Sequence, residues 1–241
     1  MLKNRTRGLS IAIKRFNLNP NDAIAFFNRG QAWDSLNSDN AIADYDEAIR
    51  LDATLDNAFF FRGRAFAGKD ERDKAMSDFD AAIRLNPNHA KCFHLRGLTW
   101  LVKNEFDKAL ADLDEAVRLE PNEATYISAR GLAWANKNEL DKAIDDFNEA
   151  IRLNPNDAST FSTRGKVWLH KNELGNAIAD FDDAIRLNPN DAAAFSERGQ
   201  AWANLNEFDK AISDYNEAIR LNPDDGLHQF RRHLAQRNQT R

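Results

Sequence analysis

The fold of this chain is decided by residues 124–157, which read ATYISARGLAWANKNELDKAIDDFNEAIRLNPND. Asn138 and Glu139 form a polar turn near the middle, and Pro155 ends the second half because proline interrupts a helix. Each half holds three residues spaced four and three apart, which places them on one face of a helix. These are Ile127, Gly131 and Trp134 in the first half, and Ala143, Phe147 and Ala150 in the second. The stretch therefore predicts two helices joined by a tight turn.

The same pattern recurs six times along the chain. An Arg-Gly pair marks each copy, and the glycines follow one another at spacings of 33, 34, 34, 34 and 34 residues. All five tryptophans stand three residues after one of these glycines. A proline closes five of the copies, at Pro87, Pro121, Pro155, Pro189 and Pro223. A period of 34 with this order of anchors resembles the tetratricopeptide repeat.

The resemblance implies an all-α, right-handed α-solenoid of six helix-turn-helix repeats with terminal capping helices. We expect residues 1–22 to be a degenerate half-repeat that caps the N-terminus, and residues 226–241 to be a basic capping helix. The six repeats are expected in residues 23–225, as 23–55, 56–89, 90–123, 124–157, 158–191 and 192–225.

The chain departs from the family pattern in the first helix of each repeat. Arginine replaces the usual leucine before the glycine, and phenylalanine or Ile127 replaces the usual tryptophan four residues before it. An aspartate recurs as regularly in the second helix, so we expect a structural ion-pair ladder, within a repeat or across to its neighbour. An anion-binding stripe is the alternative. The ladder residues are Arg29, Arg62, Arg96, Arg130, Arg164 and Arg198, with Asp44, Asp78, Asp112, Asp146, Asp180 and Asp214.

Charge and composition exclude several classes of function. The net charge is −5, but residues 21–225 alone carry −14, because both ends are basic. An acidic body argues against a partner of duplex nucleic acid, which needs a basic face. No apolar run approaches the roughly 20 residues of a membrane helix, so no membrane partner is expected. The single cysteine is compatible with a reducing compartment, and we expect a cytoplasmic protein.

No motif indicates catalysis. His89, Cys92 and His94 cluster near the start of the third repeat, but their spacing matches no zinc motif. Glycine-rich phosphate loops and nucleophile elbows are also missing from the sequence. We therefore expect neither an enzyme nor a cofactor or metal site.

The varied flank of the first helices is the candidate binding surface. In the family this flank lines the concave surface, and here its residues differ between repeats while the anchors stay fixed. We expect a non-catalytic scaffold that holds a protein or peptide ligand, as a peptide or a helix, in this groove. A regulatory or substrate-presenting module of an enzyme complex remains open, as does a self-assembling structural protein with weak association through its basic ends. The expected groove residues are Phe27, Gln31, Phe60, Arg64, Lys91, His94, Leu98, Leu101, Val102, Ser128, Leu132, Ser162, Lys166, Leu169 and His170.

Overall fold

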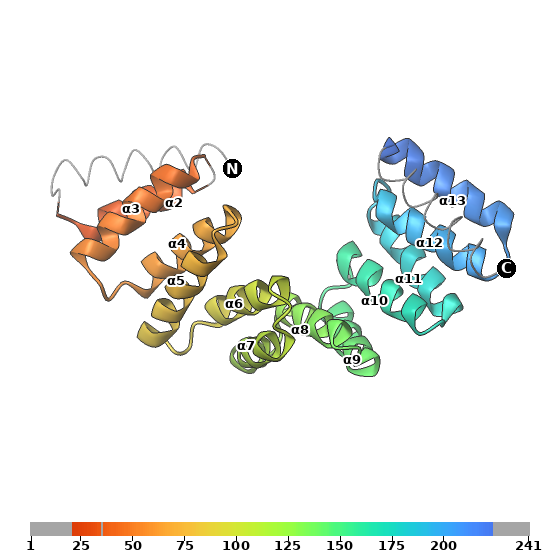
Figure 1. The fold of residues 1–241 in the computed structure, drawn as a ribbon, viewed down its shortest axis with the longest axis horizontal. Helices are drawn as coiled ribbons and strands as arrows, with labels where there is room; N and C mark the ends of the chain where they lie inside the picture. Colours follow the sequence, from red (N-terminus) through yellow and green to blue (C-terminus); the bar gives the residue numbers. More distant parts are fainter. Residues whose placement is uncertain (1–20, 35, 224–241) are drawn as a thin grey trace. The chain divides into compact units, whose positions relative to one another are not determined.

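The computed structural model of the protein describes residues 21–34 and 36–223. Within these residues the chain forms twelve α-helices and no strand, which confirms the predicted all-α fold (Figure 1). None of the helices in these ranges is both long and apolar enough to cross a lipid bilayer. The chain divides into two compact units, one ending at Pro121 and the other beginning at Asn122.

The first unit holds three pairs of consecutive helices, and the two helices of each pair pack along one another. Neighbouring pairs also touch, through α3 with α4 and through α5 with α6. The helices are α2 (Ala23–Trp33), α3 (Ser38–Leu51), α4 (Asp56–Gly68), α5 (Arg72–Leu85), α6 (Ala90–Val102) and α7 (Phe106–Leu119).

The second unit repeats this arrangement. Here α9 packs against α10 and α11 against α12, so that each pair is joined to the next. The helices are α8 (Ala124–Asn136), α9 (Leu140–Leu153), α10 (Ala158–His170), α11 (Leu174–Leu187), α12 (Ala192–Asn204) and α13 (Phe208–Leu221).

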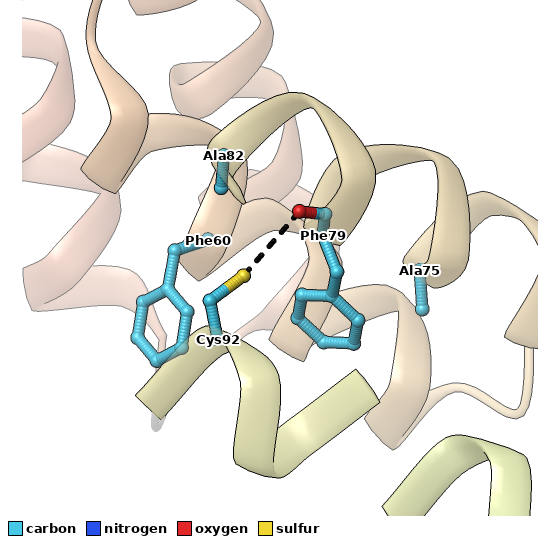
Figure 2. Packing of buried hydrophobic residues seen from close by; sticks show 5 residues of the cluster. All are labelled: Phe60, Ala75, Phe79, Ala82 and Cys92. Atoms are coloured by element: carbon cyan, nitrogen blue, oxygen red, sulfur yellow. Dashed lines mark hydrogen bonds between the residues drawn. The ribbon is translucent and has the colours of Figure 1, made fainter. Parts of the chain in front are cut away.

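A glycine in the first helix and a large side chain in the second make the closest contact within each pair. In α4, a methyl group added at Gly63 would lie 2.9 Å from Cε1 of Phe79, closer than two carbon atoms approach. Phe79 is fully buried, and its ring fills the space that the missing side chain leaves. Figure 2 shows the core around it, formed by Phe60, Ala75, Phe79, Ala82 and Cys92. The equivalent partners of the other repeat glycines are Tyr45, Leu113, Phe147, Phe181 and Tyr215.

A left-handed residue closes the turn between the helices of a pair. Asn138 has a φ of 64°, a conformation that asparagine tolerates better than most residues. The Glu139 N–H then donates to the Trp134 carbonyl at 3.0 Å, and the Asn138 N–H donates to the Ala135 carbonyl at 2.9 Å. These two bonds satisfy carbonyls at the end of α8 in the Schellman pattern. The same conformation recurs at Asp70, Asn104, Asn172 and Asn206.

The predicted terminal caps, residues 1–22 and 226–241, lie outside the described residues except for Asn21 and Asp22. The Asp22 carboxylate begins α2, because it accepts hydrogen bonds from the N–H groups of Ile24 at 3.0 Å and Ala25 at 3.2 Å. This is the expected N-cap of a first helix.

Candidate functional site

The arginine series lies in bidentate contact with the aspartate series. Nε of Arg62 lies 2.8 Å from Oδ2 of Asp78, and Nη2 lies 2.6 Å from Oδ1. Of the two partners that the sequence left open, the aspartate of the same repeat receives both bonds. The same geometry joins Arg29 to Asp44, Arg96 to Asp112, Arg130 to Asp146, Arg164 to Asp180 and Arg198 to Asp214.

The third guanidinium nitrogen reaches the preceding repeat. Nη1 of Arg62 donates to Asp46 Oδ1 at 2.6 Å, so one side chain connects α4 to both α5 and α3. The equivalent bonds run from Arg96 to Asp80, from Arg164 to Asn148 and from Arg198 to Asp182. The arginine ladder therefore holds repeats together as well as closing each one.

The arginine before a repeat glycine and the phenylalanine four residues before that glycine, both departures from the family pattern, contact each other. The guanidinium of Arg62 lies 5.6 Å from the ring centroid of Phe59, three residues earlier on the same helix face. A cation over an aromatic face is attracted by the ring quadrupole. Arg29 over Phe26, Arg96 over Phe93, Arg164 over Phe161 and Arg198 over Phe195 repeat the contact.

Electrostatics agree with a structural role for the ladder. The hydrogen bond to Asp214 raises the pKa of Arg198, against the opposing effect of burial. Its side chain keeps 19% of its exposure, and the Asp214 side chain keeps 8%. Groups that are this covered and this fully paired have little capacity left for a ligand.

Of the residues His89, Cys92 and His94, the first two are packing residues. The Cys92 side chain is buried, and its Sγ lies 3.5 Å from the Phe79 carbonyl oxygen (Figure 2). Burial raises the pKa of the thiol to about 12, so it stays protonated at neutral pH. The His89 ring lies 4.7 Å from the ring of Phe60. Across residues 21–34 and 36–223 no three His, Cys, Asp or Glu side chains come together as metal ligands would.

In the first unit, the varied flank is largely engaged with itself. The Arg64 guanidinium lies 4.6 Å from the ring centroid of Phe61 and forms an ion pair with Asp34. The rings of Phe61 and Phe27 are 5.6 Å apart and nearly perpendicular. Of the other expected groove residues in this unit, three are half-buried, namely His94, Leu98 and Leu101. Three are exposed, namely Gln31, Lys91 and Val102.

Two expected groove residues are wrong. Phe60 is 5% exposed, because its ring packs against those of Phe61, Phe79 and His89. Ser162 is 8% exposed. Helical angle alone put these residues on the groove flank, and it takes no account of the neighbouring side chains that cover Phe60.

In the second unit, the flank forms two adjoining hollows, lined by α8, α10, α12 and the first residue of α9. We call these two hollows together the unit-2 groove. The apolar hollow has a volume of about 210 Å³ and the polar hollow about 330 Å³. Lys166 and His170, one turn apart on α10, border both. The other residues of the apolar hollow are Leu132, Ala135, Asn136, Leu140, Thr163 and Val167. Those of the polar hollow are Leu169, Glu197, Gln200 and Asn204.

Sequence reasoning named four of these residues, Leu132, Lys166, Leu169 and His170, and omitted most of the polar ones. Ser128 is half-buried, and its hydroxyl lies 3.2 Å from that of Thr160. The omitted Asn136 and Asn204 stand five residues after a repeat glycine, the position of His170. A comparison of that one position across the last three repeats would have found them.

Paired helices stacked in repeats, with hollows on the first helices of the second unit, define a helical repeat protein. Models of the tetratricopeptide repeat match residues 56–89, 95–158 and 192–225, which together make up more than half of the chain. The chain belongs to the tetratricopeptide repeat family, whose fold is that of protein–protein interaction scaffolds and is typically non-catalytic. No curated protein matches the chain in sequence.

Solved structures share the fold. The Cut9–Hcn1 hetero-tetramer of the APC/C is similar with a TM-score of 0.82 and 18% identity, over 95% of this chain and 46% of that one. The chain thus spans less than half the length of that relative. PilF of Pseudomonas aeruginosa gives a TM-score of 0.76 and 18% identity, over 89% of this chain and 97% of that one. YrrB is described as a TPR protein with an unusual peptide-binding site. It gives a TM-score of 0.63 and 27% identity, over 76% of this chain and 95% of that one.

Proposed function

We propose that the protein is a non-catalytic scaffold that binds a peptide segment of a partner protein in the unit-2 groove. The observation that carries this proposal is Leu132, which is 39% exposed at the rim of the apolar hollow. Packing within the repeat does not require an apolar residue there, since Lys166 and Gln200 occupy the equivalent positions of the next two repeats. Leu132 is not isolated, because Ala135, Leu140 and Val167 line the same hollow, and a contiguous apolar surface is typical of an interaction site.

The similarity to YrrB supports the same function. At 27% identity over most of its length, that protein is described as having a peptide-binding site. The two hollows supply what such a site needs, an apolar place for a side chain and polar groups that fix its orientation.

The test is capture of a partner by the full chain and by a groove variant. Leu132→Ser combined with Leu169→Ser should leave the helical content unchanged and weaken binding, because an anchor residue often contributes about 2 kcal/mol, roughly thirtyfold in affinity. Partners would be taken from native lysate, identified by mass spectrometry and then titrated in purified form.

Leu205→Ser is the matched control, since Leu205 is 43% exposed in the same unit but lines neither hollow. It should bind as the unchanged chain does. Full binding by the folded double variant, or an equal loss in the control, would place the site elsewhere.

A further inference from the structure

We infer, on the basis of the proposed function, that the unit-2 groove takes its partner as an extended, uncharged segment whose main chain hydrogen-bonds to the groove, and not as a helix.

A row of hydrogen-bonding side chains crosses the groove. Asn136, His170 and Asn204 end α8, α10 and α12 in turn, and all three are exposed. Gln200 adds a third carboxamide, one turn before Asn204. Carboxamides, like neutral imidazole, offer both a donor and an acceptor, as a peptide group does. The Asn136 amide donates to the Leu132 carbonyl at 2.8 Å, which holds it at the rim of the apolar hollow.

The formal charges of the groove offset each other. The Lys166 ammonium lies 3.7 Å from the Glu197 carboxylate, and these are the only lysine and the only acidic residue that line the two hollows. A carboxylate of the partner would be attracted by Lys166 but repelled by Glu197. An ammonium group of the partner would be attracted by Glu197 but repelled by Lys166. Neither charge is favoured, whereas a neutral peptide group can bond to either residue.

The spacing of the row fits an extended chain. Helices in contact lie about 8–10 Å apart, and an extended chain advances about 3.3 Å per residue. A partner that crosses from α8 to α10, or from α10 to α12, therefore advances by about three residues at each step. A helical partner already uses its main-chain donors and acceptors within itself. Its main chain would offer no bonds to Asn136, His170 and Asn204, which could then be met only by polar side chains of the helix. An extended segment can place one apolar side chain in the apolar hollow and its peptide groups along the row.

The experiment is a selection from short random peptides displayed on phage against the full chain, with counter-selection against Leu132→Asp. The selected peptides, synthesised with blocked ends, would be titrated after single N-methylation of each amide, which removes a main-chain donor and keeps every side chain. We expect one or two N-methylations beyond the apolar residue to weaken binding about three- to tenfold, the usual worth of one hydrogen bond. Asn204→Leu should produce a similar loss with an unchanged melting temperature.

Three results overturn the inference. One is a set of peptides that become helical when bound, as seen by circular dichroism. Another is a uniform tolerance of N-methylation. The third is a requirement for a charged residue next to the apolar one. In each case a dependence on Leu132 would leave the proposed function standing. Peptides that bind regardless of Leu132, or no binding peptides, would contradict the proposed function itself.

Discussion

Removing one arginine of the ladder should be far more damaging than removing an arginine from a surface ion pair. Arg62→Met leaves the carboxylate of Asp78, whose side chain is 6% exposed, without the two bonds it now accepts. It also removes the bond to Asp46 that joins two repeats. Loss of one partner from a buried ion pair costs about 3–5 kcal/mol. Because the Arg62 side chain is 19% exposed, water can reach the stranded carboxylate, and we expect about 2–3 kcal/mol.

Urea denaturation followed by circular dichroism would measure this loss. Arg50→Met is the matched control, since Arg50 makes the same bidentate bonds to Glu47 but its side chain is 63% exposed and that of Glu47 is 34% exposed. Its removal should change the free energy of unfolding very little. Adding Asp78→Asn to Arg62→Met should recover part of the stability by removing the stranded charge. Equal stability of the Arg62 and Arg50 variants would refute a structural role for the ladder.

Three further predictions concern stability. Gly63→Ala should destabilise the protein by about 1–3 kcal/mol, because the added methyl group would press on Phe79. Gly68→Ala should stabilise it by up to about 1 kcal/mol, because a methyl group there meets no neighbouring atom within 4 Å. Thermal melts of the two variants would compare these effects. Burial lowers the pKa of His89, so the unfolded chain binds the proton more readily, and stability should fall as the pH drops below about 6.5. His89→Gln should flatten that pH dependence in urea titrations. Deleting residues 226–241 should cause aggregation or earlier melting if they cap the solenoid, and unchanged solubility and melting temperature would show that they do not.

The repeat architecture could be predicted from sequence because its anchors are local and identical. A glycine, an aromatic residue and a proline at fixed spacing specify the helix pair without knowledge of its neighbours. The contact of Arg62 with Asp78 was expected for the same reason, since both residues recur in register.

The groove was harder to predict because exposure depends on adjacent helices. The same helix flank leaves Leu132 exposed in one repeat but places Phe60 under the rings of its neighbours in another. The lysine bonds between adjacent repeats were also missed, although a signal for them exists. Lys103 contacts Asp73 at 2.8 Å, thirty residues earlier, and Lys69 and Lys171 pair with acidic residues at the same separation.

The symmetry of the arginine bonds bears on how such a chain can change length. Arg62 stands sixteen residues before Asp78 and sixteen residues after Asp46. Excising or duplicating one whole 34-residue unit therefore joins an arginine to equivalent acceptors on both sides, and no buried charge loses its partner. An insertion or deletion of another size within a unit must be absorbed by the turn between its helices, as in the first unit, where Arg29 still bonds to Asp44 although only fifteen residues separate them. Gene rearrangements that respect the period keep every one of these bonds, so the array can lengthen or shorten by recombination without a redesign of its core.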